Sequence, residues 1–258
     1  MNMHEATQNR LKPIRWYRTL ADREGRVSAQ AFLVEGERAI HQIIDSSPAT
    51  VLEILSPRHP PLFCQGYRWR QLTDNQLKSI SSTQTPQPII ALVKLPVDVY
   101  SNKLPDETGS KILLLEDVQD PGNVGSIIRS AAAFRFSGII MTDKCADPFS
   151  PKCVQSTAGT LLSLWIRRTA DYLLLVKELE IKGYPVAATV LQGTDSPFIL
   201  KDLDRVILAL GNEAAGLSPA VFKNARYRIK IPIDQTRAQS LNVAVCGAIC
   251  MYLSTLGN

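Results

Sequence analysis

Apolar runs alternate with helical patterns through the second part of the chain, and this alternation constrains the fold most. Five such runs lie between residues 106 and 258: KILLLED, GIIMTD, YPVAATV, RVILALGN and YRIKIPI. The helical patterns between them begin near Asn123, Pro151, Asp171, Ser218 and Ser240. Runs this continuous are typical of strands buried on both faces of a parallel sheet. The sequence therefore predicts an α/β domain whose ligands bind beyond the carboxyl ends of its strands.

Residues 1–105 have the pattern of a smaller α/β layer. The runs AFLVE, TVLEILS, YRWRQLT and PIIALVKL are rich in β-branched and aromatic residues, as strands are. Arg10–Ala21 is a candidate basic helix, and Thr73 is a candidate cap of another helix. The segment LPVDVYSNKLPDETGSK mixes charges with prolines, which favours a linker near residues 102–110. We therefore expect two domains, 1–105 and 106–258.

The charge balance differs between the two parts. Residues 1–105 hold 13 Lys and Arg against 9 Asp and Glu, whereas residues 106–258 hold 16 against 15. The surplus in the first part points mildly to a polyanionic partner. An ordinary solvated helix face is the alternative interpretation.

Other features argue against several classes of protein. No apolar run reaches the length of a membrane span, and the N-terminal residues lack the apolar core of a signal peptide. The five cysteines form no C-x-x-C pair, and the three histidines lack metal-ligand spacing. We therefore expect a cytoplasmic protein with buried thiols, no membrane segment and no metal.

Residues 113–134, LLLEDVQDPGNVGSIIRSAAAF, lead from a strand through a tight turn into a helix. Gly122 and Gly125 permit close approach of another chain or a ligand, and Asn123 has the residue type of a helix cap. Arg129 is expected in the second helical turn, among apolar neighbours. A surface arginine is the plain alternative, and a dinucleotide-binding loop would need a third glycine.

Two later loops follow strands in the same way. In ILALGNEAAGLSP, residues 207–219, a strand ends at Gly211 and a helix begins near Ser218. In IPIDQTRAQSLNV, residues 231–243, a polar loop leads to Ser240 at the expected start of a helix rich in small residues. Taken singly, each loop is explained by capping and turning alone.

Together, and in this order, the three loops resemble the SpoU/TrmH branch of the SPOUT methyltransferases. The first motif, N-x-G-x-x-x-R, is matched by Asn123, Gly125 and Arg129. The second, G-[SN]-E-x-x-G-[LM], is matched by Gly211, Asn212, Glu213, Gly216 and Leu217. The third, I-P-[MI]…S-L-N-V, is matched by Ile231, Pro232, Ile233, Ser240, Leu241, Asn242 and Val243. FLVEGERAI in the first part resembles the L30e-like substrate-binding domain that often precedes this catalytic domain.

The resemblance implies a parallel-sheet domain with a C-terminal trefoil knot, an S-adenosylmethionine cofactor and a homodimer. It implies methylation of a ribose 2′-OH in RNA, with ribosomal RNA favoured over transfer RNA. The implied catalytic residues are Arg129, Asn123, Glu213, Ser240 and Asn242. The implied cofactor-binding residues are Gly211, Asn212, Gly216, Ile231, Pro232 and Leu241. Arg10, Arg15 and Arg18 are the candidate RNA contacts.

Three questions stay open at this point. A guanidinium is a poor base, so Arg129 acts either as a strongly perturbed base or by stabilising the developing alkoxide. The loop after Pro232 lacks the glycine usual in the family, so a non-catalytic RNA-binding protein with this fold is the second hypothesis. A Rossmann-type oxidoreductase is a third, weakened by its incomplete glycine fingerprint.

Overall fold

A computed structural model describes residues 12–257. The chain divides into two compact units, Met1–Leu95 with Phe149–Pro151, and Pro96–Pro148 with Lys152–Asn258. The segment expected as a linker, residues 102–110, falls inside the second unit by this division. Arg10, one of the candidate RNA contacts, lies outside the described residues.

The first unit contains a four-stranded sheet in the order β1-β4-β2-β3. The strands are β1 (Ala31–Glu35), β2 (Val51–Ser56), β3 (Trp69–Gln71) and β4 (Ile90–Lys94), and all four were predicted. The helices are α2 (Ile14–Thr19), α3 (Arg23–Ala29), α4 (Glu37–Ser46) and α5 (Asp74–Ile80), with 3-10 turns at Pro48–Thr50 and Leu62–Cys64. The predicted cap is confirmed, because Thr73 and Gln76 form a reciprocal capping box at the start of α5.

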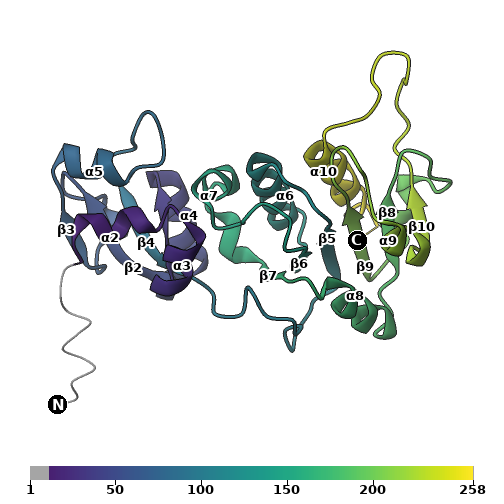
Figure 1. The fold of residues 1–258 in the computed structure, drawn as a ribbon, viewed down its shortest axis with the longest axis horizontal. Helices are drawn as coiled ribbons and strands as arrows, with labels where there is room; N and C mark the ends of the chain where they lie inside the picture. The colour runs from purple at the N-terminus through teal and green to yellow at the C-terminus, as the bar shows by residue number, and fades with distance from the viewer. Residues whose placement is uncertain (1–11, 258) are drawn as a thin grey trace. The chain divides into compact units, whose positions relative to one another are not determined.

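The second unit contains a six-stranded sheet whose pairings are all parallel, in the order β10-β8-β9-β5-β6-β7 (Figure 1). Its strands are β5 (Lys111–Leu115), β6 (Gly138–Met141), β7 (Trp165–Arg168), β8 (Val186–Thr189), β9 (Val206–Leu210) and β10 (Tyr227–Ile229). Every residue of β5, β6 and β9 is buried, as the continuous apolar runs predicted.

Helices cover both faces of this sheet. They are α6 (Pro121–Ala133), α7 (Pro151–Thr157), α8 (Tyr172–Ile181), α9 (Pro219–Asn224) and α10 (Val243–Leu253), with 3-10 turns at Thr160–Ser163 and Pro197–Asp202. Leu175 and Leu179 of α8 and Val221 of α9 share one buried cluster with the sheet residues Ile112 and Ile207. α6 and α10 lie side by side (Figure 1).

The close approach of α10 to the sheet depends on a glycine. A Cβ atom at Gly247 would lie 2.7 Å from Cδ1 of Leu210 in β9. The small-residue helix therefore packs closely, as its sequence predicted. The trefoil knot stays a prediction, since strand order and register do not establish the path of one segment through another.

Two predicted helix caps were wrong. The side chain of Asp120, not that of Asn123, caps α6 by accepting a hydrogen bond from the Asn123 backbone N–H at 2.8 Å. Asn242, not Ser240, caps α10. Pro121 occupies the first turn of α6, where its missing N–H costs nothing. As a result α6 begins earlier than expected, and Arg129 lies in its third turn rather than its second.

Candidate active site

A cavity of about 590 Å³ opens beyond the carboxyl ends of β8, β9 and β10, next to the first turn of α10. Its walls come from the loops after those strands and from the residues that lead into α10. The position agrees with the general rule for ligand sites in parallel sheets. Eight residues predicted for the site line it: Gly211, Asn212, Glu213, Gly216, Ile231, Ser240, Leu241 and Asn242.

The loop after β9 turns back on itself at the cavity. Asn212 N–H donates to the Gly216 carbonyl at 3.1 Å, and Gly216 N–H donates to the Asn212 carbonyl at 2.9 Å. A Cβ atom at Gly211 would lie 2.4 Å from the carbonyl carbon of Gly216. Gly216 itself has φ +71°, a conformation that glycine adopts without strain. Both glycines of the second motif are therefore required by the shape of this loop.

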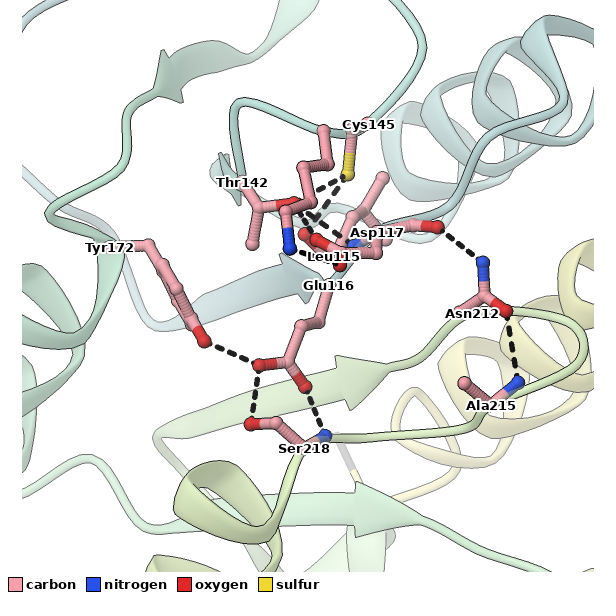
Figure 2. A network of polar contacts seen from close by, with 10 residues as sticks. Leu115, Glu116, Asp117, Thr142, Cys145, Tyr172, Asn212, Ala215 and Ser218 are labelled. Atoms are coloured by element: carbon pink, nitrogen blue, oxygen red, sulfur yellow. Dashed lines mark hydrogen bonds and ion pairs between the residues drawn. The ribbon is translucent and has the colours of Figure 1, made fainter.

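The side chain of Asn212 closes the loop internally. Its Oδ1 accepts hydrogen bonds from the backbone N–H groups of Ala214 and Ala215, both at 2.9 Å. Its Nδ2 donates to the Asp117 carbonyl at 2.8 Å, in the loop after β5 (Figure 2). The polar atoms of this side chain are thus engaged with protein, although the residue was predicted to bind cofactor.

A chain of hydrogen bonds joins the three predicted motifs at the cavity. Nδ2 of Asn242 donates to Oδ1 of Asn123 at 2.9 Å. Nδ2 of Asn123 in turn donates to Oε1 of Glu213 at 2.8 Å. Asn242 also accepts from the N–H groups of Ala244 and Val245, which fixes it at the start of α10. Segments 90 and more residues apart in sequence therefore meet at one polar cluster, which we call the Asn–Glu cluster.

Arg129 is not part of the Asn–Glu cluster. It is exposed, and it makes no hydrogen bond or ion pair with any residue between 12 and 257. Six residues of helix separate it from Asn123, which corresponds to a rotation of about 120° and an advance of about 9 Å. The two side chains therefore leave α6 in different directions, and Arg129 presents a free cation to solvent.

The remaining predicted residues are placed as follows. Pro232 is exposed and does not line the cavity, whereas its neighbours Ile231 and Ile233 do. Arg15 and Arg18 are exposed on α2 of the first unit. Within residues 12–257, no group of three or more His, Cys, Asp or Glu side chains has the arrangement of a metal site. Over the same range, no helix combines the length and apolar character needed to cross a membrane.

Residues 110–252 match the SpoU rRNA methylase family, and residues 12–91 match the MRM3-like substrate-binding domain. The first match covers more than half of the chain. The protein belongs to the SpoU rRNA methylase family. This membership confirms the resemblance that the three loops indicated.

Individual family relatives are similar over almost the whole chain. The 23S rRNA (guanosine(2553)-2′-O)-methyltransferase RlmP of Bacillus subtilis is 30% identical, with 98% of each chain covered. A 23S rRNA (uridine(2479)-2′-O)-methyltransferase of Streptomyces viridochromogenes is 29% identical, over 92% of this chain and 86% of its own. The crystal structure of the SpoU methyltransferase AviRb from S. viridochromogenes, in complex with AdoMet, superposes with TM-score 0.80 at 27% identity. That superposition covers 95% of this chain and 97% of the other.

Part of this SpoU-family cavity was missed by the sequence reasoning. The cavity is also lined by Thr189, the last residue of β8, by the next three residues Val190, Leu191 and Gln192, and by Cys246 of α10. The strand YPVAATV was predicted, and the rule for carboxyl ends would have extended the site to the residues after it. What the sequence did not reveal is that α10 begins beside β8, β9 and β10.

Cys246 differs from the other four thiols of the chain. Cys64, Cys145, Cys153 and Cys250 are buried as expected, whereas Cys246 is partly exposed at the cavity wall. Hydrogen bonds from the Cys250 and Thr189 side chains lower the pKa of the Cys246 thiol against the opposing effect of burial. Burial raises the pKa of Cys153, so that thiol stays protonated.

The geometry of the site suits an elongated ligand with an apolar ring system. Apolar side chains of Ile231, Leu241 and Val243 face a loop that has no side chain at Gly211. A flat group can lie against these apolar side chains, while the Asn–Glu cluster supplies polar groups at the side of the cavity nearest α6. The arrangement combines apolar walls with a few polar groups, as ligand sites commonly do.

Proposed function

We propose that this protein transfers a methyl group from S-adenosylmethionine to a ribose 2′-OH of ribosomal RNA. The observation that carries the proposal is the Asn–Glu cluster, in which Glu213, Asn123 and Asn242 meet beside the cavity. The named activities of the B. subtilis and S. viridochromogenes relatives support the substrate class. We further propose that the protein works in the cytoplasm, as the sequence led us to expect.

The cavity fits the cofactor that this reaction needs. Gly211, Ile231 and Leu241 would hold its flat adenosine portion, because all three line the cavity and the side chains of the last two are apolar. S-Adenosylmethionine supplies a methyl group that its positive sulfonium already activates. In the reaction, the sulfur–methyl bond breaks as a bond forms to the ribose oxygen. The hydroxyl proton passes to the neighbouring phosphate or to water, and S-adenosylhomocysteine then leaves.

We assign the protein's catalytic contribution to positioning and charge. Glu213 and Asn123 would orient the ribose for in-line displacement, which is worth much of the barrier in such reactions. Ser240 and Asn242 would hold the end of the third loop against the ribose or cofactor. Arg129 would stabilise the developing alkoxide and bind the neighbouring phosphate, because a positive charge placed near developing negative charge lowers the barrier. Its freedom from protein partners supports this assignment.

We infer that the working form is a homodimer built on α10 and α6. Val245, Ala248, Ile249 and Tyr252 share one side of α10, and Val245 and Tyr252 are 49% and 51% exposed. An apolar helix face left to solvent marks an interaction site. Phe134, at the end of α6, contacts Tyr252 with ring centroids 6.0 Å apart, so the outward face of α6 lies alongside. Pairing through this face would bring Arg129 towards the partner's cavity. Arg129 could then take part in catalysis although it points away from the Asn–Glu cluster of its own chain.

The first unit is proposed to bind RNA. Arg15 and Arg18 are exposed on α2, and Lys12 lies over the Trp16 ring at 5.4 Å. Trp16 is half-buried, and cations beside a partly exposed aromatic ring are typical of surfaces that bind phosphate and unstacked bases. Arg10 is assigned to the same surface on the basis of sequence alone.

The test is transfer of tritiated methyl from S-adenosylmethionine to ribosomal RNA from cells that lack the gene. We expect incorporation at a ribose by the wild type. Arg129→Ala should lower the transfer rate at least about 100-fold, as loss of one oxyanion donor does, while calorimetry shows unchanged cofactor affinity. Arg205→Ala, which removes another exposed arginine of the second unit, is the matched control and should transfer normally.

The non-catalytic hypothesis makes the opposite prediction for the wild type. If the protein binds RNA but neither binds S-adenosylmethionine nor transfers methyl, the proposed activity is wrong. If Arg129→Ala transfers at the wild-type rate, the activity stands and the role given to this arginine is wrong.

A further inference from the structure

Two loops leave the sheet next to each other at its carboxyl edge. β5 and β9 pair in parallel, with Leu115 opposite Leu210. The pairing continues one residue further, because Glu116 N–H donates to the Leu210 carbonyl at 2.9 Å. The chain after β5 then leads to α6 and Asn123. The chain after β9 forms the loop Gly211–Ser218 at the cofactor cavity.

Glu116 holds the far end of that loop, at Ser218, by hydrogen bonds. It is 4% exposed, and its carboxylate accepts hydrogen bonds from Ser218 N–H at 2.7 Å and from Ser218 Oγ at 2.6 Å (Figure 2). The Tyr172 hydroxyl donates to the same carboxylate. Burial and this contact raise the pKa of Tyr172 to about 12, so it stays a donor. A buried carboxylate with all its partners in place fixes where α9 begins.

Asp117 holds the near end of the loop, at Asn212. Its backbone lies at φ +57°, a left-handed conformation that is uncommon for any residue other than glycine. Thr142 holds it there, because its Oγ1 donates to Asp117 Oδ1 at 2.6 Å and accepts from Asp117 N–H at 3.0 Å. In this conformation the Asp117 carbonyl accepts the hydrogen bond from Asn212 Nδ2. Figure 2 shows that Thr142 and Asn212 both contact Asp117, which lies just beyond the end of β5.

Neither acid contacts the proposed cofactor cavity. Glu116 and Asp117 line instead a second cavity, of about 760 Å³, which shares residues of the Gly211–Ser218 loop with the first. Glu213 lies between the two anchored ends, and it must meet Asn123 for the Asn–Glu cluster to form. The two acids therefore act on the site from outside the cavity, through the loop that they hold.

We propose that Glu116 and Asp117 are positioning residues that clamp the two ends of the Gly211–Ser218 loop, so that Glu213 reaches Asn123 and the cofactor cavity keeps its shape. The proposal deepens the methyltransferase assignment and rests on it. It gives Glu116 a role through its side chain, and Asp117 a role through its backbone conformation.

The backbone role of Asp117 yields a discriminating pair of variants. Asp117→Gly keeps the carbonyl and enters the left-handed region freely, whereas Asp117→Val disfavours that region strongly. We expect Asp117→Gly to keep kcat within about threefold of the wild type. We expect Asp117→Val to lose between about 10- and 100-fold in kcat, as small misplacements of reacting groups do. Glu116→Ala should behave like Asp117→Val, and both should weaken S-adenosylmethionine binding several-fold.

Two matched controls separate positioning from stability. Asp98→Ala removes the carboxylate that pairs with buried Arg167, and Tyr184→Phe removes a hydroxyl bonded to the Gly109 carbonyl; both lie in the second unit outside the site. Each variant is measured for kcat, KM for RNA, cofactor Kd and thermal midpoint. The controls should lower the midpoint and leave kcat and Kd unchanged. KM for RNA should stay constant throughout, because the first unit is untouched.

The outcomes are distinct. If folded Glu116→Ala keeps wild-type kcat and Kd, or if Asp117→Gly fails as badly as Asp117→Val, the clamp is refuted. If the wild type binds S-adenosylmethionine but transfers no methyl, the proposed function fails instead. The clamp is then judged from the cofactor Kd of the same variants, where Glu116→Ala and Asp117→Val must still weaken binding while Asp117→Gly does not.

Discussion

Gly211 directly follows β9, at a point where the returning loop leaves no room for a side chain. A Cβ atom there would meet the Gly216 carbonyl carbon at 2.4 Å and Leu217 N at 2.6 Å. Backbone on both sides cannot yield as a flexible side chain can. This position therefore tests whether loop shape, rather than any polar group, sets cofactor affinity.

We predict that Gly211→Ala weakens S-adenosylmethionine binding at least about 10-fold, because the displaced loop carries the cavity wall with it. Isothermal calorimetry measures the affinity. Gly183→Ala is the control, since Gly183 has φ +87° in open space at the end of α8. It should cost about 1 kcal/mol of folding stability through backbone strain, with cofactor affinity unchanged. Equal affinities for the two variants would contradict this view of the loop.

Among the helices, α6 links folding stability to the active site, because Asn123 of the Asn–Glu cluster lies in its first turn. Asp120 caps this helix, and a hydrogen bond from the Asn123 N–H, aided by Lys152 at 3.1 Å, lowers the pKa of Asp120 below its ordinary 3.8. A lowered folded-state pKa stabilises the fold above the unfolded value. That contribution is present above about pH 4 and is lost as acid protonates the folded carboxylate.

Asp120→Asn keeps a good cap but cannot titrate. The wild type should therefore exceed this variant in unfolding free energy near neutral pH, and the difference should shrink to zero as the pH falls below 3.8. Urea unfolding monitored from acid to neutral pH measures it. A difference that stays constant with pH would show that the carboxylate charge contributes nothing to α6.

The helices and strands also show which features could be predicted from the sequence and which could not. Five strands of the second unit were predicted because their runs are apolar, whereas β7 was missed because WIRR carries two arginines. Arg167 is buried through hydrogen bonds to Asp98 and to the Lys103 carbonyl, partners that no local pattern reveals. The sequence identified the motif residues. It assigned the caps of α6 and α10 to Asn123 and Ser240 instead of Asp120 and Asn242, because all four residues are of types that cap helices well. The contribution of the β8 loop needed the three-dimensional path of the chain.

For the whole molecule, the proposed division of labour places RNA affinity in the first unit. Replacing Arg15 and Arg18 together by Ala should weaken RNA binding and lower the slope of log K against log salt by about 0.7 to 0.9 for each phosphate that is no longer neutralised. Filter binding over a series of salt concentrations measures both. Lys177→Ala with Lys201→Ala removes equal charge from exposed positions of the second unit and should leave the slope unchanged. If the two double variants gave identical slopes, α2 would not be part of the RNA-binding surface.

The proposed homodimer gives the strongest prediction at this scale, because it would couple assembly to catalysis. Val245 is half exposed on the apolar side of α10, in the first turn of the helix, so a charge there would be buried without a partner in the proposed dimer. We predict that Val245→Asp yields a monomer in sedimentation experiments, still binds S-adenosylmethionine, and loses methyl transfer at least about 100-fold because Arg129 no longer meets a partner's site. Ile181→Asp changes an 80% exposed apolar residue on α8 and should stay dimeric and active. A monomeric wild type, or a monomeric Val245→Asp with full activity, would show that each chain completes its own site, and Arg129 would then have to reach its own Asn–Glu cluster by a movement of α6.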